Sequence, residues 1–318
     1  MDSGAREKEI PKPRGMSRRT FLDTMIGGGA GLVVGTVLNK MGIQKPIEGV
    51  LGVNRDTTTV DVGSDLQLEK ASKEQLNQEP QKSEFDRVFE GLQEGDKGIA
   101  RSMVDEMKYE VLYPHSSFNE MMAVTNTFQS QIREAAKEFG LPSDLVSGMV
   151  FVENGGGVDQ TSDAGARGPA QLLPDTARQY GLLVNEEVDE RTNPDKCFLA
   201  MCNYLSDLRD KFGGDLGIAV WGYHAGDGNV YGTLRAYFQD TEGIDLGDII
   251  SDSADEAMRV AQAYSQKIKQ TKLNIHRLLS NSAAKYEILV NRGLTDETEL
   301  YTYKAVGGAE IFAEQNGD

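Results

Sequence analysis

Apolar residues recur at the spacing of an α-helix through the second half of the chain. Between Phe118 and Phe139 they stand three or four positions apart, which predicts one helix that Gly140 ends. Patterns typical of strands are weak and confined to short pieces after Glu153. The folded part is therefore predicted to be mainly α. Further helices are predicted over residues 174–180, 196–211, 217–223, 254–279 and near 299–312.

One predicted helix ends in an isolated acid. Pro142 opens it, and Val146, Met149, Val150 and Glu153 then fall on the same helical face. Because burial of an unpartnered carboxylate costs free energy, Glu153 is a candidate for chemistry at the mouth of a cleft. The alternative is a solvated acid at a helix end, with Gly155 as the C-cap residue.

The N-terminal residues 1–42 have the outline of an export segment. A basic start precedes a weakly apolar run of glycine and small residues that is too short for a typical membrane span. Arg18 and Arg19, after Ser17 and before Phe21 and Leu22, resemble a twin-arginine signal. The protein is expected to be exported to the cell envelope or periplasm, anchored in the membrane if the segment stays uncleaved. A nucleotide-binding glycine loop is the rival interpretation, but no predicted strand precedes the run.

Composition divides the rest of the chain. Residues 43–100 are polar with few aromatics, which predicts a disordered linker. Residues 101–318 are predicted to form the folded domain, with the core motifs over 118–238 and a helical extension over 243–318. The net charge of −17 over 318 residues argues against a nucleic-acid partner, and none is expected. The three histidines are far apart, so neither a metal site nor a cofactor is expected.

Three motifs follow one another in the predicted domain. They read E-N-G-G from Glu153, S-x-x-G-A-x-G-P-x-Q-x-x-P-x-T-A from Ser162, and Y-H-A-G-x-G from Tyr223. Their order and spacing resemble the soluble lytic transglycosylases, and E-T-x-x-Y ending at Tyr301 resembles a further family motif. The resemblance implies an α-rich domain similar to goose-type lysozyme, acting on the glycan strands of peptidoglycan. Asn154 stands where the family usually has Ser, and His224 stands where it has Asn.

The resemblance also implies roles for individual residues. Glu153 would be the catalytic acid and then the base, and Tyr223 would hold the substrate's acetamido group or support the transition state. Substrate-binding positions are Ser162, Gln171, Tyr301, Gly168 and Ala225. Ser162 has an alternative role as the cap of a turn, and Gly168 as a residue chosen for backbone freedom. Trp221, the only tryptophan, is expected in the core rather than in a sugar-binding platform.

Two other functions remain open at this point. A hydrolytic muramidase on the same fold would need a second carboxylate, for which Asp159 or Asp163 is the candidate. A non-catalytic peptidoglycan-binding or scaffold protein would be favoured by an Arg or Lys paired with Glu153. Otherwise Glu153 would protonate the bond between N-acetylmuramic acid and N-acetylglucosamine, and a 1,6-anhydro product would form.

Overall fold

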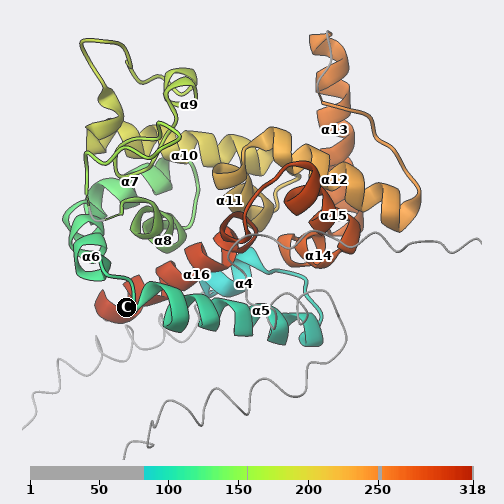
Figure 1. Cartoon of the computed structure of the whole chain (residues 1–318), viewed down its shortest axis with the longest axis horizontal. Coiled ribbons are helices and arrows are strands. Elements are labelled where there is room, and N and C mark those ends of the chain that lie inside the picture. The colour runs from blue at the N-terminus through green and yellow to red at the C-terminus, as the bar shows by residue number, and fades with distance from the viewer. Residues whose placement is uncertain (1–81, 156, 250–252, 317–318) are drawn as a thin grey trace, which may run out of the picture. The chain divides into compact units, whose positions relative to one another are not determined.

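The computed structural model describes residues 82–155, 157–249 and 253–316, and the regular secondary structure of these residues is helical (Figure 1). In the described residues, β-structure is limited to isolated antiparallel bridges, such as that between Thr161 and Arg167. The mainly α prediction is confirmed. The twin-arginine-like signal and the linker as far as residue 81 lie outside the described residues.

Short connections join most of the helices, and longer segments lie between α8 and α10 and between α12 and α13. Their bounds are α4 Glu84–Val88, α5 Glu94–Glu106, the π-helix η1 Met107–Leu112, α6 Phe118–Thr127, α7 Gln129–Glu138, α8 Ser143–Glu153, α9 Pro174–Gln179, the 3-10 helix η2 Glu190–Thr192, α10 Pro194–Lys211, α11 Leu216–Ala225, α12 Asp227–Glu242, α13 Ala254–Thr271, α14 Ile275–Ser280, α15 Ser282–Tyr286, the π-helix η3 Glu287–Asn291 and α16 Asp296–Asn316.

Two helices predicted as continuous are interrupted. The helix predicted over 118–139 is divided into α6 and α7 at Phe128, whose backbone leaves the helical conformation and whose ring packs against Phe198 of α10. The helix predicted over 254–279 ends at Lys272, which adopts a left-handed conformation, and Asn274 caps α14. Apolar periodicity continues through both breaks, so periodicity alone does not reveal them.

The structure also differs from the sequence analysis between residues 82 and 100, which were assigned to the polar linker. These residues begin with α4, where Phe85, Val88 and Phe89 are buried, and the Phe89 ring stacks on Tyr303 of α16. Ser83 caps the helix by accepting a hydrogen bond from the Asp86 amide. Three apolar residues at helical spacing are enough to bury one face of a short helix, even in a polar stretch.

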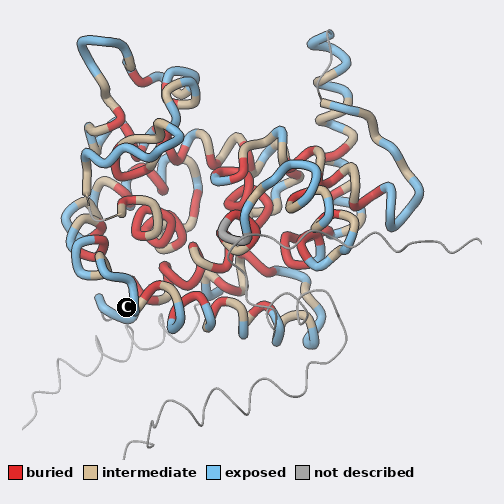
Figure 2. The backbone as a smooth tube through the Cα atoms, in the orientation of Figure 1, coloured by how far each residue is buried: buried red, intermediate tan, exposed pale blue. Residues whose placement is uncertain are grey.

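Helix α16 lies in the middle of the core, where it packs against α8, α11, α5, η1 and α4 (Figure 1). Buried residues concentrate along α8, α11 and α16 (Figure 2). Gly148 allows the backbones of α8 and α16 to lie close together, because a Cβ at this position would lie 2.4 Å from the Ala305 oxygen and the Ala309 nitrogen. This contact brings the chain's last helix against the helix that ends in Glu153. None of the described helices combines the length and apolar character that a membrane crossing requires.

Candidate active site

Glu153 is the last residue of α8, and only 13% of its side chain is exposed. Gly155 follows in a left-handed conformation with φ +54°, as expected of a residue just past a helix end. Helix α8 therefore ends with the Gly155 cap that the solvated-acid alternative predicted. The Glu153 carboxylate is nevertheless largely buried. The sequence analysis correctly placed Glu153 on the buried side of its helix.

Asn154 fixes the end of this helix. Its side chain is fully buried, and Nδ2 donates among acceptors that include the Met121 carbonyl at 3.2 Å and Thr125 Oγ1 at 3.1 Å. Both acceptors belong to α6, so the amide ties the residue after Glu153 to a neighbouring helix. Serine, the usual residue here in the lytic transglycosylases that the motifs resemble, has a shorter side chain than asparagine. The sequence indicated Asn154 only as a departure from the motif.

Tyr301 of α16 lies beside Glu153. It is 1% exposed, and its buried hydroxyl has no hydrogen bond of standard geometry within the described part of the chain. Burial, followed by the negative charge of Glu153 and a hydrogen-bond contact with that carboxylate, raises the pKa of Tyr301 well above its usual value. The hydroxyl therefore stays protonated and is available as a hydrogen-bond donor next to the carboxylate.

His224 of α11 completes this group. Its Nδ1 lies 3.8 Å from Glu153 Oε1, and its ring stacks on Tyr301 with centroids 4.3 Å apart and planes 9° apart. Within residues 82–316 as described, no Lys or Arg nitrogen lies within 4.0 Å of the Glu153 carboxylate. The pairing that would have favoured a scaffold protein is thus not found there. The motif comparison singled out His224 only as a replacement for Asn.

Tyr223 precedes His224 and points to the loop after α8. Its hydroxyl donates a 2.6 Å hydrogen bond to the Ala170 carbonyl, and its ring packs on Tyr204 at 5.3 Å. Burial, followed by the charge of Glu153, raises the pKa of Tyr223. The proton of this hydroxyl is engaged with Ala170, so the oxygen can meet a ligand only as an acceptor.

The remaining loop residues hold the loop's own shape. Ser162 Oγ accepts from the Ala166 amide at 3.1 Å, which is the turn-capping role of a serine. Gly168 has φ +83°, and a Cβ there would lie 2.0 Å from the Arg191 oxygen. Gln171 Nε2 donates to the Gly168 carbonyl at 2.9 Å, which leaves its amide oxygen for another partner.

Other candidate positions lie at the helix ends and in the core. Ala225 is buried at the end of α11, and its carbonyl accepts from Asn229 Nδ2 at 2.7 Å. Trp221 is fully buried and donates to the Thr298 carbonyl at 2.9 Å, so its expected core position is confirmed. Asp159 pairs with Arg167 at 2.5 Å, and Asp163 is exposed.

Comparison with known proteins supports the resemblance drawn from the motifs. Residues 130–242 match the family model of the transglycosylase SLT domain, a segment that includes Glu153, the following loop and Tyr223. Over 150 residues the chain is 27% identical to membrane-bound lytic murein transglycosylase D of Escherichia coli K12, and equally to that of E. coli O6:H1 CFT073. The match covers 47% of this chain and 32% of each relative, so it spans about a third of their length.

Among solved structures, the chain is similar to an inactive mutant of the lytic transglycosylase Slt from Pseudomonas aeruginosa. The superposition has a TM-score of 0.40 at 19% identity, and it covers 69% of this chain and 30% of that one.

Proposed function

We propose that the protein is a peptidoglycan lytic transglycosylase, with Glu153 acting first as acid and then as base. The observation that carries the proposal is the largely covered Glu153 carboxylate inside the matched SLT segment, with Tyr301 and His224 beside it and no Lys or Arg of the described residues within 4.0 Å. A single acid without a Lys or Arg partner can carry a proton to a leaving group.

The reaction requires one proton to move in each direction. Glu153 gives its proton to the glycosidic oxygen between N-acetylmuramic acid and N-acetylglucosamine, and the bond from C1 to that oxygen breaks. The oxygen of the muramyl 2-acetamido group bonds to C1 and takes up the positive charge. Glu153, now ionised, removes the proton of the C6 hydroxyl, whose oxygen attacks C1 and displaces the acetamido oxygen. A 1,6-anhydro product leaves, and Glu153 is protonated again.

Two tyrosines support these steps. The Tyr301 hydroxyl can donate to Glu153 once the carboxylate is ionised, which orients it toward the C6 hydroxyl. The Tyr223 oxygen, with its proton engaged by Ala170, accepts from the N–H of the acetamido group and turns the acetamido oxygen toward C1.

The loop after α8 forms the binding surface in this proposal. The amide oxygen of Gln171 accepts from a sugar hydroxyl, because its nitrogen is already engaged with Gly168. Ser162, Gly168 and Ala225 act through the backbone shape that they maintain.

Hydrolysis is disfavoured as an alternative. A muramidase of this fold needs a second carboxylate to activate water. Asp159 is engaged with Arg167, and Asp163 stands in an exposed turn.

We further propose that the protein acts in the cell envelope. Its peptidoglycan substrate lies there, the two E. coli relatives are membrane-bound by name, and the N-terminal residues 1–42 resemble an export signal.

Mass spectrometry of soluble muropeptides tests the chemistry. The full chain, Glu153→Gln and the control Glu120→Gln, an exposed acid of α6, are each incubated with purified peptidoglycan. We expect 1,6-anhydro products, lighter than hydrolysis products by one water, from the native chain and the control but not from Glu153→Gln. Reducing-end products would show a muramidase instead, and equal release by Glu153→Gln would exclude Glu153 as the acid.

A further inference from the structure

His224 is the most exposed of the three side chains gathered at the candidate site. Its side chain is 31% exposed, whereas that of Glu153 is 13% exposed and Tyr301 is 1% exposed. The imidazole therefore reaches the surface from which a substrate approaches the acid. It replaces the asparagine that is usual at this position in the lytic transglycosylases that the motifs resemble.

One ring nitrogen of His224 lies near the carboxylate. Nδ1 is 3.8 Å from Oε1 of Glu153, which is longer than a hydrogen bond. Contacts of catalytic groups are often long before a substrate is bound, and they shorten in the complex. Because an ionised carboxylate only accepts hydrogen bonds, Nδ1 can bond to it when this nitrogen carries a proton.

The Tyr301 ring sets the plane of the imidazole. The two rings are stacked, with centroids 4.3 Å apart and planes 9° apart. Tyr301 belongs to α16 in the middle of the core, where close packing holds its ring in place. The imidazole can shift within its own plane without leaving the stack, so Nδ1 can approach the carboxylate while the tyrosine stays fixed.

Lysines of α10 and α15 are engaged with other carboxylates. Lys211 Nζ lies 3.3 Å from Asp227 Oδ2. Lys285 Nζ lies 2.8 Å from Glu299 Oε1. Within the described part of the chain, no Lys or Arg nitrogen lies within 4.0 Å of the Glu153 carboxylate. The imidazole and the tyrosine hydroxyl are therefore the side-chain donors that the described residues bring to this acid.

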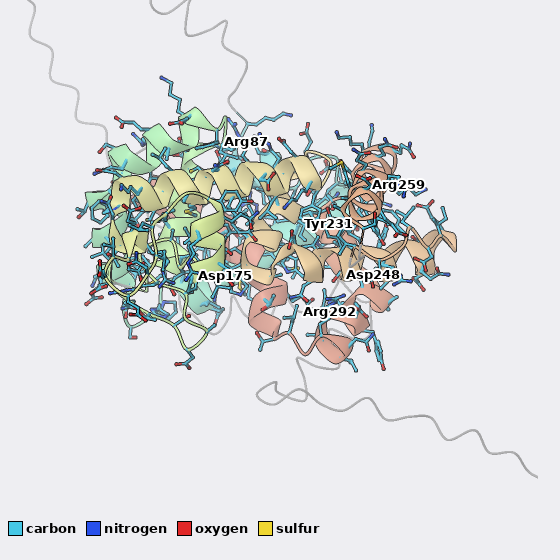
Figure 3. The ribbon with its side chains drawn as sticks, turned by 90° about the horizontal axis from the view of Figure 1, so that it is seen from above. Arg87, Asp175, Tyr231, Asp248, Arg259 and Arg292 are labelled. Atoms are coloured by element: carbon cyan, nitrogen blue, oxygen red, sulfur yellow. The ribbon has the colours of Figure 1, made fainter. Side chains whose placement is uncertain are left out.

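Two arginines of α12 and the segment after η3 lie in a separate pocket. This pocket of about 580 Å³ is lined by none of the three side chains at the candidate site. Arg235 donates to Asp245 at 2.9 and 2.7 Å, and Arg292 donates to Glu287 at 2.9 Å. Figure 3 shows Arg292 toward the α13 side of the described unit. These guanidinium groups are engaged within their own pocket.

We infer that His224 is a positioning residue for Glu153, and this inference rests on the proposed function. Its Nδ1–H donates to the carboxylate, and the contact strengthens as Glu153 gives its proton to the glycosidic oxygen and becomes ionised. A contact that is stronger in the transition state than before it lowers the barrier. The ring keeps its own proton throughout, and the ionised carboxylate is held until it takes up the proton of the C6 hydroxyl.

The chemistry of the two amino acids explains why histidine can stand where asparagine is usual. In asparagine, Nδ2 is bonded to Cγ, and in histidine, Nδ1 is bonded to Cγ. Both side chains therefore place a nitrogen at the same number of bonds from the backbone, and both nitrogens can donate. Histidine adds the ring that stacks on Tyr301. The inference therefore predicts that the N–H, rather than the ring, supports the reaction.

Two variants of His224 separate the N–H from the ring. His224→Phe keeps a ring for stacking and has no N–H, and His224→Asn keeps an N–H and has no ring. With soluble glycan strands as substrate, we expect His224→Phe to lower kcat about tenfold and to leave KM within about twofold, because one charge-assisted hydrogen bond is lost. We expect kcat of His224→Asn to stay within about threefold of the native value.

A control variant and thermal unfolding complete this test. His115→Asn, an exposed histidine between η1 and α6, should leave kcat unchanged. Melting temperatures show whether each variant is folded at the assay temperature. An unchanged kcat in folded His224→Phe would overturn the inference. Equal losses in His224→Phe and His224→Asn would also overturn it, because they would show that the shape of the ring matters rather than the N–H.

Nitrogen NMR of the imidazole rings tests the contact without the reaction. The chain has three histidines, so the signals of His224 are assigned by their loss in His224→Asn. We expect its Nδ1 to carry a proton at neutral pH. An unprotonated Nδ1 would reject the inference even if the chain forms 1,6-anhydro products. A protonated Nδ1 in a native chain that forms no such product would reject the transglycosylase alone.

Discussion

At the scale of single residues, the candidate site consists of polar side chains that lie close to one carboxylate, that of Glu153. The Tyr301 hydroxyl is buried beside Glu153, and the His224 ring stacks on the Tyr301 ring. Glu153 acts on the Tyr301 hydroxyl through its charge and through a hydrogen-bond contact, and we propose that the hydroxyl assists this carboxylate.

The variant Tyr301→Phe separates the contribution of the Tyr301 hydroxyl to stability from its contribution to the reaction rate. We expect a nearly unchanged melting temperature, because phenylalanine keeps the buried ring of Tyr301 and its packing. The rate of 1,6-anhydro product formation should fall about tenfold to a hundredfold, because the ionised Glu153 loses a donor. Kinetics and thermal unfolding of the same preparation check both. An unchanged rate would show that the hydroxyl does not assist Glu153.

At the scale of elements, the site depends on the contact between α8 and α16. Glu153 ends α8 and Tyr301 belongs to α16, so the separation of the two helices sets the distance between carboxylate and hydroxyl. Gly148 makes that separation small, since the α16 backbone occupies the space of a Cβ. Backbone atoms on one helix cannot move aside as a flexible side chain can.

Gly148→Ala is therefore expected to force the helices apart. The free energy of unfolding should fall by about 1–3 kcal/mol or more, and activity should fall with it. Gly98→Ala, on the exposed side of α5 where a Cβ meets nothing within 4 Å, is the matched control. It should stabilise the protein by about 0.5–1 kcal/mol. Denaturant unfolding measures both, and a neutral Gly148→Ala would contradict the close contact.

At the scale of the whole molecule, stability is expected to depend on pH through buried carboxyl groups. Burial raises the pKa of Glu84 to about 7, against the opposing charge of Arg87, and its Oε2 is buried without a partner. Burial likewise raises the pKa of Asp215 to about 7, although the amides of Ile218 and Gly217 oppose it. Both groups favour the folded state while protonated.

The direction of the effect follows from these shifts. Because the pKa of Glu84 is raised in the folded state, its contribution is complete below its unfolded value of 4.5 and disappears as pH rises through about 7. Glu84→Gln should remove about 1–2 kcal/mol of this pH dependence, after allowance for partial exposure. Unfolding free energies at pH 5 and pH 8.5, with Glu120→Gln as control, test it. An identical pH dependence in Glu84→Gln and the native chain would contradict the assignment.

The sequence by itself determined the mainly α character, the start of α8 and the placement of Glu153 on its buried face. These features are local, because apolar spacing and capping residues act within a few turns of helix. The ordered motifs also predicted that Tyr223 lies near that acid, and the charge of Glu153 is among the causes that raise the Tyr223 pKa.

Only the tertiary structure decided which distant groups meet. Tyr301 and His224 reach Glu153 from two other helices. The Tyr223 hydroxyl donates to the Ala170 carbonyl, and residues of α12 and η3 together line a pocket. The breaks at Phe128 and Lys272 and the burial of α4 belong to the same class. Each depends on packing between segments far apart in the chain, and local spacing does not encode which faces will touch.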